Sequence, residues 1–162
     1  METPDYAYGL FVSGDAVFVA DGMSGLRVVD ASDVTAPKEI GVLDASSAAW
    51  DVWVTESHAY LAHGFAGLRI VDISDRSAPK EVGSVATPDY AHGVLVAGNV
   101  AFVADWDSGL LVMDIFDPTS PCEVAGLATP GMVSGVHVGG NYAYVADWDG
   151  GLLIARIGDT RA

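Results

Sequence analysis

Short apolar runs separated by Gly, Asp and Pro turns make up the whole chain, and they return at a fixed spacing. The run Gly-Leu-Arg-Val-Val-Asp at residues 25–30 recurs as related hexapeptides at residues 67–72, 109–114 and 151–156, a period of 42 residues. A period of roughly 40–45 residues built from short strands is typical of the blades of a β-propeller. Because no ten-residue stretch carries a helical apolar period, the pattern predicts an all-β chain of four blades.

Each repeat contains the apolar runs expected of a blade. Ahead of the Gly-Leu strand lie an inner strand and, after a tight turn, a second strand in which small alanines flank a larger residue. Inner strands are predicted at residues 10–12, 52–54, 94–96 and 136–138, and second strands at 16–20, 59–62, 101–104 and 143–146. A fourth strand begins after Pro37, Pro79 and Pro121. The prediction is one domain, 1–162, with blades at 3–44, 45–86, 87–128 and 129–162.

The last blade is expected to lack its outer strand, because the sequence stops at Ala162 and Met1 and Glu2 supply only the end of such a strand. The first and last blades are as apolar as the middle ones, and stacked repeats need neighbours to cover their faces. We therefore expect a homodimer, in which two half-rings pair head to tail about a two-fold axis and close an eight-bladed ring.

Charge narrows the class of partner. The sequence has 22 acidic and 7 basic side chains and a formal net charge of −15, which repels phosphate backbones and anionic lipid. We therefore expect no nucleic-acid partner. Membrane insertion is not expected either, because no window approaches the ~20 apolar residues of a membrane helix. The N-terminus lacks the basic and apolar segments of a signal peptide. A cation, a basic protein or a neutral molecule is the better ligand.

The repeat motif resembles that of a known family. The strand Gly-Leu-x-[VI]-[VM]-Asp, with Ala-[FY]-[VL]-Ala before it and a Ser-Asp-x-x-x-Pro turn after it, is similar to the repeats of the LVIVD-repeat β-propeller family. The resemblance covers nearly the whole chain, although Arg156 stands in the fourth copy where the first three have Asp. It implies a propeller and an exported or cell-surface location, and it carries no catalytic residues.

Departures from the repeat gather at one end of the predicted blades. The loops that enter the inner strands and the loops between the second and third strands emerge there together, and both sets vary between repeats. Variable loops rich in aromatic, His and Asp residues are typical of a binding rim. The candidate ligand-binding residues are Tyr8, Trp50, Asp51, His63, His92, Asp105, Trp106 and Trp148. The two last tryptophans also suit a packing role between blades.

His63 and His92 break their repeat pattern most sharply and stand on neighbouring blades. With Asp51 and Asp105 they form a candidate site for a divalent metal ion that activates water. The alternative interpretation is a set of hydrogen-bonded polar residues at a solvated channel mouth. Asp105 also recurs in two other repeats, which fits a structural role in the turn.

Two hypotheses for the function remain from different classes. The first is a non-catalytic scaffold that binds a protein or small-molecule ligand through aromatic and acidic residues at one rim of the channel. The alternative is a metal-dependent hydrolase with a His/Asp site on the rim of blades two and three. The sequence contains no Gly-x-Ser-x-Gly elbow and no phosphate-binding glycine loop, so no catalytic residue can be named and the scaffold is favoured.

Overall fold

The computed structural model describes residues 1–158 and consists of antiparallel sheets, three with four strands and one with three. Each sheet is one repeat, with its strands in chain order. They are β1 (Gly9–Ser13), β2 (Ala16–Ala20), β3 (Leu26–Asp30) and β4 (Lys38–Leu43); β5 (Asp51–Val54), β6 (His58–Ala62), β7 (Leu68–Asp72) and β8 (Lys80–Val85); β9 (Gly93–Ala97), β10 (Val100–Ala104), β11 (Leu110–Asp114) and β12 (Cys122–Leu127); and β13 (Val133–Gly139), β14 (Tyr142–Asp147) and β15 (Gly151–Arg156). The predicted all-β chain of four blades is confirmed.

Helix is nearly absent from the described residues. The short 3-10 helix η1 (Trp148–Gly150) lies between β14 and β15. None of the helical structure in residues 1–158 is long and apolar enough to cross a membrane.

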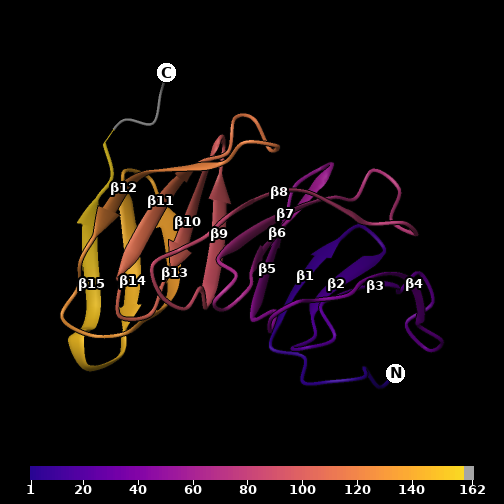
Figure 1. Cartoon of the computed structure of the whole chain (residues 1–162). Coiled ribbons are helices and arrows are strands. Elements are labelled where there is room, and N and C mark those ends of the chain that lie inside the picture. The colour runs from indigo at the N-terminus through magenta and orange to yellow at the C-terminus, as the bar shows by residue number, and fades with distance from the viewer. Residues whose placement is uncertain (159–162) are drawn as a thin grey trace.

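The four sheets stand side by side in an open row (Figure 1). The inner strand of each blade packs beside the inner strand of the next, from β1 to β5, from β5 to β9 and from β9 to β13. Blade 1 (β1–β4) and blade 4 (β13–β15) lie at opposite ends of the row. Within residues 1–158, each end blade therefore has a neighbour on one side.

The glycine that opens each Gly-Leu strand is required by the backbone. Gly25, Gly67, Gly109 and Gly151 all have positive φ, between 73° and 85°, which is the left-handed region that glycine tolerates best. At Gly25 a Cβ would also overlap the carbonyl oxygen of Leu43 in the next strand. The turn into the third strand therefore fixes glycine at this place in every repeat.

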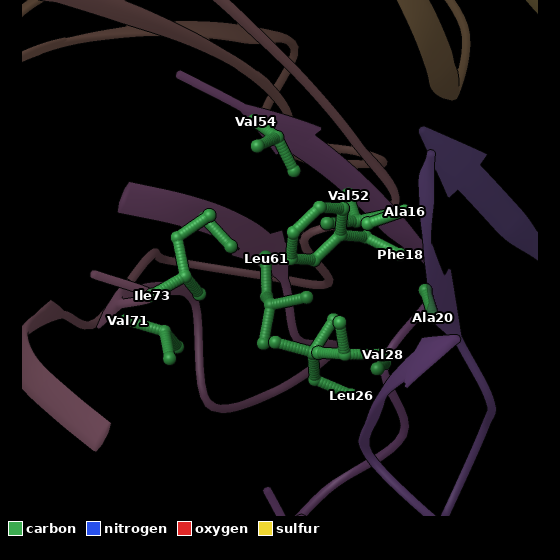
Figure 2. Packing of buried hydrophobic residues seen from close by; sticks show 12 residues of the cluster. Ala16, Phe18, Ala20, Leu26, Val28, Val52, Val54, Leu61, Val71 and Ile73 are labelled. Atoms are coloured by element: carbon green, nitrogen blue, oxygen red, sulfur yellow. The ribbon is translucent and has the colours of Figure 1, made fainter. Parts of the chain in front are cut away.

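The hydrophobic core is divided among the contacts between blades. In the first contact, Phe18 and Leu26 of blade 1 face Val52, Leu61 and Ile73 of blade 2, and all five side chains are buried (Figure 2). Similar clusters fill the next two contacts. Because each sheet is covered on both faces in the middle of the row, its strands are apolar on both faces and show little alternation.

Apolar side chains are exposed on the outer faces of the two end blades, where no neighbouring blade covers them. Leu152 of blade 4 is 69% exposed, whereas Leu68, at the same place in the repeat, is fully buried. On the opposite flank, Leu10 of blade 1 is 66% exposed and its equivalent Val52 only 2%. The end faces therefore have the composition of blade contacts without a partner inside the chain.

Outer strands approach the next blade closely at one point. A Cβ placed on Gly41 in β4 would overlap the carbonyl oxygen of Arg76, and one on Gly83 in β8 would overlap that of Pro118. These glycines therefore let the loop between the third and fourth strands of one blade lie against the outer strand of the preceding blade.

We expect Gly41→Ala to lower the free energy of unfolding by about 1–3 kcal/mol, because the added methyl group must push two backbones apart. Gly126→Ala in β12 is the matched control, since its Cβ would meet only ordinary van der Waals contacts. Urea unfolding of both variants measures the difference. Equal midpoints for the two variants would show that the blades can separate without cost.

Candidate functional site

The candidate rim is the end of the blades where each inner strand begins and each second strand finishes. Gly9 at the start of β1 pairs with Ala20 at the end of β2, so Tyr8 and the β2–β3 turn emerge together. Isolated bridges tie this end of the first three blades to the following repeat, from Gly22 to Ala49, from Gly64 to Ala91 and from Trp106 to Val133. All eight candidate residues come from this end of the strands.

Three candidate side chains from consecutive blades stack in a line along the rim. The ring centroids of Tyr8 and Trp50 are 4.1 Å apart and those of Trp50 and His92 are 5.0 Å apart, both in stacked orientation. Nδ1 of His92 lies 3.0 Å from the carbonyl oxygen of Ser134. Because a carbonyl oxygen can only accept, this ring nitrogen carries the proton. The His92 ring is thus held by this bond at its edge and by stacking on Trp50.

A groove of about 490 Å³ opens beside this line across blades 2, 3 and 4. Tyr90 joins its walls through edge-to-face contacts with Trp50, Phe65 and Trp106, at centroid distances of 5.6, 4.6 and 6.3 Å. The Tyr90 hydroxyl accepts a hydrogen bond of 2.6 Å from Nε1 of Trp50. His92, Trp148 and Asp89 complete the lining. We call these seven residues the aromatic groove.

Trp106 has an unusual backbone conformation within this groove. Its φ is +45°, the only positive value outside glycine in residues 1–158. The same place in the first two repeats is held by Gly22 and Gly64, with φ of +51° and +53°. A residue with a Cβ costs roughly 1–2 kcal/mol in this region, so the third blade has a large aromatic ring where the backbone favours glycine.

Asp51 is placed away from the groove and serves the contact between blades. Its two carboxylate oxygens accept hydrogen bonds from the backbone N–H groups of Val52, at 2.9 Å, and of Val94 in β9, at 3.0 Å. Burial raises the pKa of Asp51, and these two hydrogen bonds partly offset that effect. Asp51 therefore links β5 to β9 and lies outside the lining of the groove.

Asp105 is fully buried and holds the segment that enters its own blade. Its carboxylate accepts the backbone N–H of Asp89 at 2.9 Å, while the Asp89 carboxylate accepts the N–H of Asp107 at 3.0 Å. We call this reciprocal pair of bonds the clasp. In blade 1 the pair is Asp21 with Asp5. The recurring aspartate therefore has a structural role here, in which it holds the entry segment of the blade and not its own turn. Burial raises the pKa of Asp105.

His63 lies in a separate, smaller cavity. The cavity measures about 200 Å³ and places His63 beside Arg69 and Glu81, which pair with each other at 2.7 Å. The imidazole is 5% exposed. Burial and the positive charge of Arg69 lower the pKa of His63, and the carboxylate of Glu81 opposes this shift.

The proposed metal ligands are not brought together. His92 lies in the aromatic groove, His63 in the smaller cavity, and the carboxylates of Asp51 and Asp105 are engaged by backbone amides. Residues 1–158 contain no group of three or more His, Cys, Asp or Glu side chains that could hold a metal ion. The four predicted ligands therefore do not form such a group in the part of the chain that the structure describes, because being at the same end of the blades does not make side chains converge.

Four segments of the sequence match the LVIVD repeat, at residues 4–45, 47–87, 88–129 and 130–159. The chain belongs to the LVIVD repeat family. Each matched segment corresponds to one sheet, so one LVIVD repeat forms one blade. No curated protein matches the chain.

Two solved structures are similar to this chain of LVIVD repeats. The computationally designed Ika4 protein aligns with a TM-score of 0.78 and 13% identity, over 97% of this chain and 94% of Ika4. The computationally designed Ika8 protein aligns with a TM-score of 0.74 and 14% identity, over 96% of this chain and 47% of Ika8. The chain thus spans about half the length of Ika8. At these identities the likeness shows the fold alone.

The second LVIVD repeat departs from the others in two linked places. It has His63 where Asp21, Asp105 and Asp147 stand, and its entry segment at residues 45–48 lacks the Thr-Pro-Asp sequence that the clasp holds in the first and third blades. Both partners of the clasp are therefore missing from the same blade. The unusual residue at position 63 therefore coincides with the loss of the clasp in this blade.

We expect acidification to destabilise the protein through His63. The pKa of His63 is lowered in the fold. The contribution of neutral His63 to the free energy of unfolding is therefore fully present above the ordinary pKa of ~6.5, and it is lost as pH falls through the folded pKa. The reason is that the unfolded chain then binds a proton that the folded chain does not. The loss reaches at most about 1.4 kcal/mol per pH unit for one such group. Arg69, Glu81 and Asp44 are the charged groups that line the same cavity.

Urea unfolding at pH 7.5 and pH 5.5 measures this effect, with His63→Gln as the matched variant. The difference between wild type and variant isolates His63 from Asp51 and Asp105, whose raised pKa values act in the opposite direction. An identical loss in the two proteins would remove His63 as the cause.

Sequence reasoning found four of the groove residues and missed three. Trp50 and His92 were visible because they differ from their equivalents in the other LVIVD repeats, and Trp106 and Trp148 because they share a position that is Gly in the first two repeats. Tyr90 was hidden because it recurs as Tyr6 in the first repeat, so it looked like part of the consensus. Asp89 recurs as Asp5 in the first repeat, and Phe65 lies in a loop whose sequence differs in every repeat, so neither stands out in the sequence. Only their place in the fold shows that they line the groove.

Proposed function

We propose that this LVIVD-repeat chain is a non-catalytic binding scaffold whose ligand occupies the aromatic groove. The observation that carries the proposal is the convergence of five aromatic rings and His92, from three blades, on one concave surface of about 490 Å³. Ligand sites are typically concave, largely apolar and supplied with a few polar groups. Phe65 and Trp148 are both largely exposed there, which leaves ring surface free for a ligand.

The alternative of a metal-dependent hydrolase lacks support, because its four ligands lie in separate environments. The polar groups of the groove are also few. The Tyr90 hydroxyl and Nδ1 of His92 already have hydrogen-bond partners. We therefore assign the groove a binding role.

The indole N–H signals of the four tryptophans test this proposal. Trp50, Trp106 and Trp148 line the groove, whereas Trp53 packs in the core against Phe11 and serves as an internal control. The probes are choline, phenol, glucose and benzoate at millimolar concentration. We expect at least one probe to shift the three groove signals in a saturable way without shifting that of Trp53. If none does, the groove is not a binding site for small organic molecules.

We also propose that a second copy of the chain covers the two end faces. The blade 4 face consists of Tyr142, Tyr144, Leu152 and Ile154, and the blade 1 face of Leu10 and Val12 with Tyr6 and Tyr8 beside them; all are exposed. In the repeat, the first set corresponds to Ala16, Phe18, Leu26 and Val28, and the second begins with Leu10 and Val12, which correspond to Val52 and Val54. These buried equivalents form one cluster across blades 1 and 2. The blade 4 face of one copy therefore fits the blade 1 face of another.

Two such contacts about one axis would close a ring of eight blades, and the two together should bury more than ~1,000 Å². The likeness to 47% of the longer Ika8 chain is in keeping with four such blades forming part of a larger assembly. Sedimentation at low micromolar concentration is expected to give the mass of two chains. Since the net charge of −15 opposes association, the dimer should tighten as salt screens repulsion.

A further inference from the structure

We infer that the ligand of the aromatic groove is a small organic cation with an alkylated ammonium group, such as the quaternary ammonium of choline. This inference rests on the proposed binding role of the groove and adds the chemical class of its ligand. Three independent features carry it: the arrangement of the rings, the sign of the charge around them, and the backbone of Trp106.

The rings of the groove meet at angles that suit a cation. Tyr90 is turned by 84° from Phe65, by 71° from Trp50 and by 74° from Trp106. Trp106 and Trp148 are tilted by 54° to each other at 5.3 Å. An ammonium group is attracted to the negative face of an aromatic ring, and several faces set at angles surround it with such surfaces. Parallel rings alone would favour a flat ligand.

Charge complementarity points to the same class of ligand. Asp89 is the one acidic side chain among the lining residues, and it accepts the N–H of Asp107, which follows the lining residue Trp106 in the chain. No Lys or Arg of residues 1–158 lines the groove. Together with the net charge of −15, this gives the groove a negative potential that attracts cations and repels anions.

The polar groups argue against a neutral sugar. A sugar needs several free hydrogen-bonding groups, and two of those in the groove are partly engaged, because the Tyr90 hydroxyl accepts from Trp50 Nε1 and Nδ1 of His92 donates to the Ser134 carbonyl. The Tyr90 O–H can still donate and Nε2 of His92 can still accept, which is a small set for a ligand with several hydroxyl groups. An alkylated ammonium group needs few hydrogen bonds, so a wall of rings with one carboxylate is enough.

The backbone of Trp106 indicates that its ring is kept for binding. Trp106 occupies a left-handed position that two other repeats fill with glycine, and such strained residues are concentrated at ligand sites. A tryptophan that only filled space would favour an unstrained position. Trp106→Gly therefore separates the two roles, because it relieves the backbone and removes one wall of the groove.

The experiment compares choline with its neutral isostere 3,3-dimethyl-1-butanol, by calorimetry and by the tryptophan indole signals. We expect choline to bind at least tenfold more tightly. Asp89→Asn should weaken choline several-fold and leave the isostere unchanged, since the amide oxygen can still accept the N–H of Asp107. Trp106→Gly should weaken choline at least tenfold while the melting midpoint stays unchanged or rises; Trp53→Phe is the control for loss of a tryptophan outside the groove.

Each outcome is decisive. Equal binding of choline and the isostere overturns the cation inference and leaves the binding role intact. Binding of phenol or glucose without choline does the same. If Trp106→Gly lowers the melting midpoint and leaves choline binding unchanged, Trp106 is a packing residue and the inference fails. If no probe shifts the groove signals, both the inference and the proposed function fail.

Discussion

Leu152→Asp is expected to turn a two-chain assembly into single chains. Leu152 is the most exposed leucine of the blade 4 face, whereas its equivalents at the three blade contacts within the chain are buried. A carboxylate placed in such a contact without a partner costs roughly 3 kcal/mol or more. Because each dimer would contain two such sites, the dissociation constant should rise by about four orders of magnitude.

Sedimentation or light scattering at matched concentrations measures this change. Leu10→Asp, on the opposite flank, should have the same effect, because both flanks take part in each contact. Phe116→Asp is the control, since Phe116 is as exposed as these residues but lies on blade 3, away from either end face. Combining Leu10→Lys with Leu152→Asp should restore part of the association. A wild-type protein that sediments as one chain would overturn the ring.

Leu68→Ala is expected to reduce the free energy of unfolding by about 2–4 kcal/mol. Leu68 is fully buried between blades 2 and 3, in contact with a cluster that includes Val94 and Met113. The sheets on both sides are held by their own hydrogen bonds, so they cannot collapse into the space that the side chain leaves. Val124→Ala, on the exposed face of β12, should change stability by less than about 0.5 kcal/mol.

Denaturant titration of both variants gives the comparison. A loss at Leu68 no larger than that at Val124 would mean that the blades do not share a tightly packed contact.

The fold was predictable because the same pattern of strands and turns occurs four times in the sequence. The apolar runs and the Gly-Leu motif each recur in register, so an ambiguous strand in one blade is settled by its equivalents. Even the second blade, which lacks the Thr-Pro-Asp entry segment, folds with its four strands in place. A backbone requirement such as the positive φ at Gly25 leaves a direct trace in the sequence.

The site was predictable only in part, because the sequence gives the end of the blade and not the direction of each side chain. Trp50 and His92 point along the rim and meet. Asp51, next to Trp50 in the chain, points to the backbone of β9. His63 replaces a buried aspartate and stays buried. Which neighbour a residue contacts depends on the adjoining blade, and the position of a residue within the repeat does not give that information.

The inner strands of all blades run in the same direction, and this affects how many ligand sites a two-chain ring would present on one side. In every blade the groove end is the end where the inner strand begins, and a two-fold rotation along the channel axis preserves that direction. A ring of two chains would therefore present two grooves toward the same side, half a turn apart. A ligand with two suitably spaced cations could engage both, and its second contact would be intramolecular, so that even weak individual sites would retain it.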